Sequence, residues 1–171
     1  MDFSLKHLDQ LQRGTVVVVG MPTDENSTFM RGPALAPARI REVMDEGSSN
    51  LCSESGIDLS EEQRFRDLGD LGFTGAMDAL KQIEDAVGEL LDRGVYVIAL
   101  GGDHAVTYAI MKAYHTKYEV LNILHLDAHP DLYDEYEGNR YSHACPFENK
   151  KFSYVLITIN ARMWLSMLDS R

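Results

Sequence analysis

Two apolar runs, each followed by a cluster of polar residues, constrain the fold of this chain more than any other feature. Residues 95–100 run into Gly-Gly-Asp-His at 101–104. Residues 120–126 run into Asp-Ala-His-Pro-Asp at 127–131, and the segment 106–117 between the two has the length and pattern of a helix. Because such a β-α-β unit joins parallel strands by a right-handed crossover, we expect both polar clusters at the carboxyl edge of one sheet.

The rest of the chain alternates between short apolar runs and helical patterns in the same way. The segment 75–93 carries apolar residues at every third or fourth position and predicts an amphipathic helix that ends at Gly94. Further strands are expected at 15–19, 65–70 and 153–159, and a further helix at 37–47. Since no linker or internal repeat interrupts this order, we expect one α/β domain over residues 1–171.

The polar residues around the second run form a candidate metal site. In extended backbone every second side chain lies on one side, which groups the following residues: His125, Asp127, His129 and Asp131. We expect His104 to meet the last three of them. His125 lies inside the strand and is interpreted as a hydrogen-bonded core histidine or as one that supports a metal ligand. Taken singly, each residue more often satisfies only local hydrogen bonds, so the combination carries the prediction. Imidazole and carboxylate without thiolate suit manganese, iron, cobalt or catalytic zinc, and Asp127 is placed to bridge two ions.

Several neighbouring residues have two interpretations each. The pair Gly101-Gly102 forms a simple turn or lets the backbone pass close to a bound ion. Asp103 is interpreted as a cap of the following helix, in preference to an acceptor for a ligand imidazole. His143 is an ordinary surface residue or a proton-transfer group beside the metal site. A thiol nucleophile at Cys145 is disfavoured, because the sequence also offers a candidate metal site for the chemistry.

Composition excludes several classes of partner. The net charge of −11, from 16 basic and 27 acidic residues, argues against nucleic acid and suits a cationic substrate. The apolar runs are too short to cross a bilayer and the first residues lack the pattern of a signal peptide, so we expect no membrane partner and a cytoplasmic location. Cys52 and Cys145 lie far apart, which predicts neither a disulfide framework nor a zinc knuckle.

Three motifs resemble the ureohydrolase family of arginases and agmatinases. They are Gly-Gly-Asp-His at 101–104, Asp-Ala-His-Pro-Asp at 127–131 and Gly-Asn-Arg-Tyr-Ser-His at 138–143. The segments 22–33, 37–41 and 67–70 are also similar to that family. The resemblance implies a three-layer α/β/α fold with a mainly parallel sheet. It also implies a pair of Mn²⁺ ions that hydrolyses a guanidino group to urea and an amine.

The resemblance also assigns roles to single residues. His104 and Asp131 would hold one ion, His129 would hold the other, and Asp127 would bridge the two. His143 would act as the proton shuttle. The sequence Tyr-Ser-His at 141–143 is more similar to agmatinases than to arginases. We therefore expect a small cationic guanidino substrate, agmatine first and arginine second.

The resemblance does not extend to the last residues. The family completes its metal pair with an Asp-x-Asp on a later strand and binds the guanidinium with a further carboxylate, whereas the acids after Phe147 are only Glu148 and Asp169. We therefore expect an incomplete, truncated domain with an unmatched tail at 148–171. The alternatives are an active metallohydrolase and an inactive half-domain that binds metal weakly or pairs with another chain. An unpaired strand edge at 153–159 would favour association, for example as a homo-oligomer.

Overall fold

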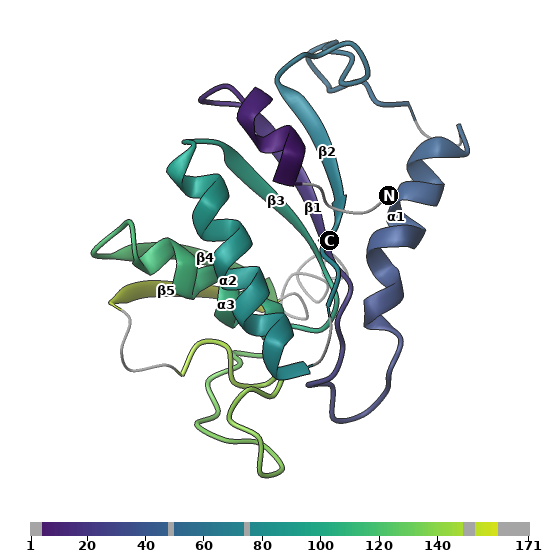
Figure 1. The fold of residues 1–171 in the computed structure, drawn as a ribbon. Coiled ribbons are helices and arrows are strands. Elements are labelled where there is room, and N and C mark those ends of the chain that lie inside the picture. The colour runs from purple at the N-terminus through teal and green to yellow at the C-terminus, as the bar shows by residue number, and fades with distance from the viewer. Residues whose placement is uncertain (1–4, 48–49, 74–75, 149–152, 161–171) are drawn as a thin grey trace, which may run out of the picture.

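A computed structural model describes residues 5–47, 50–73, 76–148 and 153–160 (Figure 1). Within these ranges no helix is both long and apolar enough to cross a membrane. The strands are β1 (Val16–Met21), β2 (Phe65–Asp70), β3 (Tyr96–Gly101), β4 (Leu121–Asp127) and β5 (Tyr154–Asn160). The helices are α1 (Ala36–Asp45), α2 (Ala76–Asp92) and α3 (Ala105–His115), with short 3-10 turns η1 (Leu5–Gln10) and η2 (Pro33–Leu35).

The described strands form two parallel sheets. The first has the order β2-β1-β3, and the second consists of β4 and β5. Parallel strands that alternate with helices give the α/β class that the sequence predicts. The expectation that residues 95–100 and 120–126 lie in one sheet was wrong for the described residues, because β3 pairs with β1 and β4 pairs with β5. A crossover helix fixes the direction of the strands that it joins, but it does not make them hydrogen-bonded neighbours.

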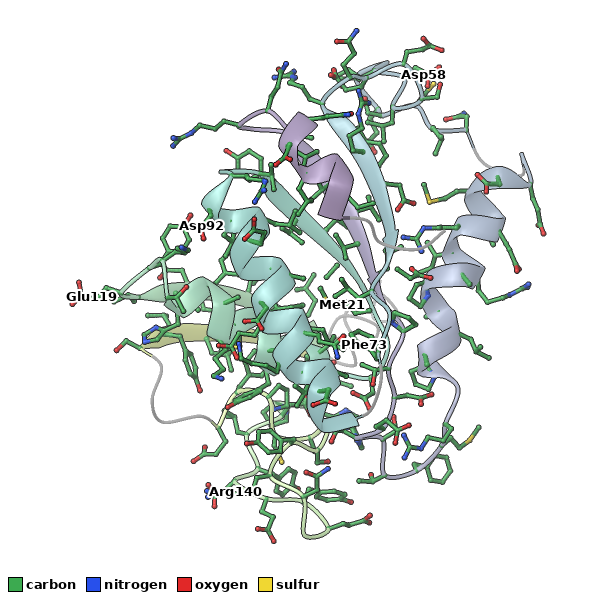
Figure 2. The ribbon with its side chains drawn as sticks, in the orientation of Figure 1. Met21, Asp58, Phe73, Asp92, Glu119 and Arg140 are labelled. Atoms are coloured by element: carbon green, nitrogen blue, oxygen red, sulfur yellow. The ribbon has the colours of Figure 1, made fainter. Side chains whose placement is uncertain are left out.

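The core lies where α2 and α3 pack on the first sheet. The apolar stripe of α2, with Ile83, Val87 and Leu90, is fully buried at the spacing that predicts this helix. Met21 at the end of β1 is also fully buried and is labelled in Figure 2. The same cluster includes Val17, Val19, Val106, Ala109 and Ala113. This packing fixes the carboxyl end of β1 and the first turn of α3, which flank the candidate site.

One face of the second sheet is apolar and exposed. An apolar run such as 120–126 predicts a buried strand, but in β4 Leu124 is 65% exposed and Leu126 is 69% exposed, so that prediction is wrong for this face. Val155 and Ile157 of β5 lie beside Asn122 and Leu124 in the register and extend the same exposed face. Because side chains alternate along a strand, His125 and Asp127 lie on the opposite, inner face. The alternation therefore separates the apolar face of β4 from the face that carries the polar residues.

Arg41 links helix α1 to strand β2 of the first sheet through ion pairs. The Arg41 guanidinium donates to both carboxylate oxygens of Asp67 at 2.6 and 2.8 Å, and it also forms an ion pair with Asp70. Burial raises the pKa of Asp67, but the hydrogen bonds from Arg41 and from the Gly69 N–H lower it more, so the net pKa lies below its ordinary value. A bidentate, charge-assisted pair of this kind is among the stronger polar links in a protein.

We expect the substitution Arg41→Gln to lower the free energy of unfolding by about 1–3 kcal/mol at neutral pH, because it removes charge-assisted hydrogen bonds. Since the folded pKa of Asp67 is depressed, its contribution is present above the unfolded pKa of about 4 and is lost as the pH falls through the folded value. The difference between variant and wild type in urea unfolding should therefore shrink at acid pH. Arg39→Gln is the matched control, because Arg39 on the same helix pairs with Glu42 in an exposed position. Equal losses in the two variants would contradict the prediction.

Candidate metal centre

The turn between β3 and α3 places His104. A Cβ atom built on Gly102 would overlap the carbonyl oxygen of Thr23, and the Asp103 N–H donates to that same oxygen at 2.9 Å. Glycine is therefore needed here for close approach to the neighbouring chain segment. The Asp103 carboxylate accepts a hydrogen bond from the Ala105 N–H at 3.0 Å, which agrees with its interpretation as a helix cap. These contacts hold His104 at the first turn of α3.

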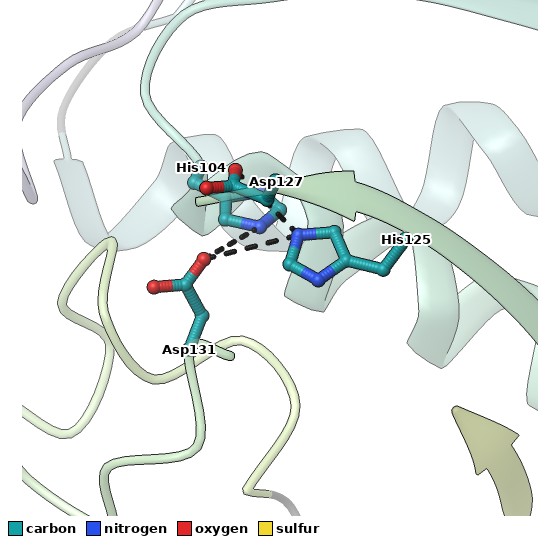
Figure 3. A group of neighbouring side chains, drawn as sticks. All are labelled: His104, His125, Asp127 and Asp131. Atoms are coloured by element: carbon teal, nitrogen blue, oxygen red, sulfur yellow. Dashed lines mark ion pairs between the residues drawn. The ribbon is translucent and has the colours of Figure 1, made fainter. Parts of the chain in front are cut away.

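The end of β4 and the loop after it supply the other donors. His125 lies within β4 with its side chain 8% exposed, which agrees with the prediction of a buried histidine. Asp127 is the last residue of the strand. Asp131 follows in the loop with its side chain 10% exposed and a backbone φ of 50°, in the left-handed region that aspartate tolerates better than most residues. This turn directs the Asp131 carboxylate back toward the strand end (Figure 3).

Four side chains converge at this edge of the molecule (Figure 3). One ligand atom from each lies within 4.8 Å of all the others, in the group His104, His125, Asp127 and Asp131. His104 Nε2 is 3.3 Å from Asp131 Oδ2, and His125 Nε2 is 3.6 Å from Asp127 Oδ2. Three of the four predicted ligands therefore meet, although they come from segments on two different sheets.

His129 lies beside this group but not in it. Its side chain is 78% exposed, and its Nδ1 atom is 3.5 Å from Asp127 Oδ1. The His129 N–H donates to the same oxygen at 3.0 Å. Asp127 thus has one carboxylate oxygen toward His129 and the other toward His125. This arrangement suits a carboxylate between two ions, and a ligand role for His129 stays a prediction.

The electrostatic environment favours the protonation states that bind metal. Burial lowers the pKa of His104 below its ordinary value, more than the Asp131 carboxylate raises it. Burial raises the pKa of Asp127, but the His129 N–H and the His125 imidazole lower it more, so it too lies below its ordinary value. A neutral imidazole and an ionised carboxylate are the forms in which these groups coordinate a cation.

The donor atoms fit a divalent ion. His104 Nε2 is buried and has no hydrogen-bond partner among the described residues, although it faces the Asp131 carboxylate. The other ring nitrogen, Nδ1, is 3.0 Å from the hydroxyl oxygen of Thr107, as expected for an imidazole whose orientation is fixed by a neighbour. Two imidazoles and two carboxylates without thiolate form a set that Mn²⁺ or a similar ion accepts.

A cavity of about 480 Å³ lies next to the group, a volume typical of small-molecule sites. It is lined by His129, Asp131 and His143, together with the aromatic rings of Tyr133 and Tyr136. The structure therefore brings His143 to the same hollow as the metal candidates, as a proton-transfer role requires. Cys145 nearby is buried, and burial raises the pKa of its thiol, which agrees with its exclusion as a nucleophile.

The inclusion of His125 in the group is the feature that sequence reasoning missed. Its ring stacks on that of His104 with centroids 5.4 Å apart, and the edge-on ring of Phe147 lies 4.7 Å from it. The alternation along β4 places His125 on the same side as Asp127, so the signal was present. Its position within an apolar run predicts a core histidine or one that supports a metal ligand, and the structure shows burial together with proximity to the carboxylates.

A comparison with models of known protein families shows to which family this chain belongs. A model of the arginase family matches residues 14–166. The chain belongs to the arginase family. The match ends within the segment 148–171, which we expected to lie outside the family.

This arginase-family chain is similar both to proteins named arginase and to proteins named agmatinase. It is 40% identical to an agmatinase of Bacillus anthracis over 147 residues, which is 83% of this chain and 49% of the relative. It is 36% identical to the mitochondrial arginase 1 of Oryza sativa subsp. indica over 144 residues, which is 79% of this chain and 42% of the relative. The chain thus spans about half the length of the curated relatives it matches.

Solved structures confirm the arginase-like α/β fold. An arginase from Medicago truncatula superposes with a TM-score of 0.74 at 30% identity, covering 85% of this chain and 49% of that one. A putative agmatinase from Clostridium difficile superposes with a TM-score of 0.72 at 23% identity, covering 92% of this chain and 67% of that one. The second likeness, at such low identity, supports the fold alone.

Proposed function

We propose that this domain hydrolyses a guanidino compound to urea and an amine, with manganese as the metal. The observation that carries the proposal is the convergence of two imidazoles and two carboxylates beside a cavity, in a chain of the arginase family. Imidazole and carboxylate donors without thiolate suit manganese, and its choice over iron, cobalt or zinc rests on the arginase family.

Each residue of the site has a distinct part in this reaction. His104, Asp127 and Asp131 would hold the metal, and His125 and His129 flank Asp127 on its two sides. A divalent ion held by these residues would supply the acidity that makes hydroxide available from water near neutral pH. His143, on the wall of the cavity, would pass a proton to the departing amine. The Asp131 carboxylate contributes negative charge that favours a cationic substrate.

The cavity lining favours agmatine over arginine. The side chains that line it include the rings of Tyr133 and Tyr136, with centroids 5.4 Å apart, but no lysine or arginine among the described residues. The neighbouring Arg140 is exposed and pairs with Asp134 at 2.5 Å. An arginine substrate would bring a carboxylate that finds no cation here, whereas the distal amine of agmatine can lie against aromatic faces.

The proposal is tested by urea release from manganese-loaded protein at neutral pH, with agmatine, arginine and 4-guanidinobutyrate compared. We expect kcat/KM to be highest for agmatine and at least about tenfold lower for arginine, since an unpaired carboxylate in the cavity costs more than about 1.4 kcal/mol. A chelator should abolish urea release, and added Mn²⁺ should restore it. Urea from none of the three substrates, with metal bound, would favour the alternative of an inactive chain that binds metal.

A further inference from the structure

Asn26, in the loop after β1, forms hydrogen bonds through its backbone N–H, its side-chain oxygen and its backbone carbonyl. The Asn26 N–H donates to Asp103 Oδ2 at 2.9 Å, and its side-chain oxygen accepts from Asn139 Nδ2 at 3.0 Å. Its backbone carbonyl oxygen accepts from the His143 N–H at 3.3 Å and lies 3.2 Å from His143 Nδ1. One residue therefore joins the turn that carries His104 to the loop that carries His143.

The contact with His143 fixes where the imidazole carries its proton. A carbonyl oxygen can only accept a hydrogen bond, so the contact at 3.2 Å exists only when Nδ1 is protonated. In the neutral ring Nε2 is then the acceptor. A histidine that receives or passes a proton needs one nitrogen with a lone pair and a fixed ring orientation, and the Asn26 carbonyl supplies both.

The position of that carbonyl depends on the two side chains that hold Asn26. Asp103 is 5% exposed, and its two carboxylate oxygens accept from the Asn26 N–H on one side and from the Ala105 N–H on the other. Ser27 adds a weaker bond to the same carboxylate at 3.3 Å. Asn139 holds the Asn26 side chain from the loop of His143 itself. The carbonyl is therefore fixed from both segments that flank the cavity.

We propose that Asn26, held by Asp103 and Asn139, is a positioning residue that keeps His143 in the Nδ1–H tautomer, with Nε2 as the proton acceptor. The use of that tautomer in catalysis rests on the proposed function, but the tautomer itself does not. Asn26 does not line the cavity and acts through the ring of His143.

The direct test is a nitrogen–proton correlation spectrum of the histidine rings of the full, ¹⁵N-labelled chain without metal, near pH 8, above the ordinary histidine pKa of about 6.5. We expect His143 to show the Nδ1–H pattern in the wild type and a mixture of tautomers in Asn26→Ala, which removes the bond to Asn139. Asn26→Asp keeps an acceptor oxygen for Asn139 and should restore the wild-type pattern. Glu25→Ala, at an exposed position of the same loop, is the control and should leave the pattern unchanged.

Two results would overturn the inference. An Nε2–H pattern for His143 in the wild type would exclude the bond to the Asn26 carbonyl, and an unchanged Nδ1–H pattern in Asn26→Ala would exclude a role for Asn26. If Asn26→Ala does not fold, Asn139→Ala removes the same bond from the other side and should give the same mixture. In an active preparation Asn26→Ala should lower kcat about tenfold with little change in KM, since only proton transfer is impaired. Failure of urea release with an intact tautomer pattern would refute the proposed function alone.

Discussion

We expect the substitution Asp127→Ala to abolish tight Mn²⁺ binding by this domain. Asp127 is the one carboxylate that faces both His125 and His129, with oxygen–nitrogen distances of 3.6 and 3.5 Å. Its loss leaves two histidines and a single aspartate in the group of four. Because removal of even an outer partner of a metal ligand weakens binding by about 10–100-fold, loss of this shared carboxylate should exceed about 100-fold. Isothermal titration with MnCl₂ measures the change.

The control for this experiment is Asp134→Ala. Asp134 lies in the same loop as Asp131, but it pairs with Arg140, is 61% exposed and does not belong to the group. Both variants lose one negative charge, so a general electrostatic effect would weaken binding in both. Asp127→Asn keeps the shape of the side chain and should bind almost as poorly as Asp127→Ala. Mn²⁺ binding of wild-type strength in Asp127→Ala would refute the metal site.

Gly102→Ala should destabilise the domain by about 3 kcal/mol, which is the upper range for forcing an added methyl group into a packed position. The new Cβ would overlap the backbone carbonyl of Thr23, and a backbone atom cannot move aside as the end of a flexible side chain can. The hydrogen bond from the Asp103 N–H to that carbonyl holds the two segments together, so one of them must shift as a whole. Urea denaturation followed by circular dichroism measures the loss.

Gly88→Ala is the matched control for this prediction. A Cβ on Gly88, inside α2, meets no atom within 4 Å, and alanine favours a helix over glycine by about 1 kcal/mol. The two substitutions add the same methyl group and should move stability in opposite directions. Mn²⁺ affinity should also fall in Gly102→Ala, because the shifted turn carries His104. A variant as stable as wild type would show that the turn is not tightly packed.

Local structure was largely predictable from the sequence because it depends on near neighbours. The strand at 65–70 has the predicted bounds, and the helix predicted at 75–93 runs from Ala76 to Asp92. The period of three and four in α2 follows directly from the geometry of a helix on a core. The order of strands depends on contacts between distant segments, and the sequence has no local signal for it. The pairing of β4 with β5 instead of β3 was therefore missed.

The candidate site was predictable in composition but not in detail. His104, Asp127 and Asp131 meet as expected, because strand ends and tight turns are visible in the sequence. The alternation expected for His129 fails because the strand ends at Asp127 and the chain bends at residues 128 and 129. His129 therefore lies outside the group that His125, Asp127 and Asp131 form with His104.

The hydrogen bonds of Asn26 join residues that are far apart in the sequence, and this affects the order of folding. Asn26 is 77 residues from Asp103 and 117 residues from His143, so both bonds close large loops of the unfolded chain. Closing loops of this length lowers the entropy of the chain. A local helix such as α2 forms without this cost, because its hydrogen bonds join near neighbours. The local helices can therefore form early, while the alignment of His143 waits until distant parts of the chain have docked. Slow recovery of the Nδ1–H pattern of His143 during refolding would reflect this late step, after the helices have already returned.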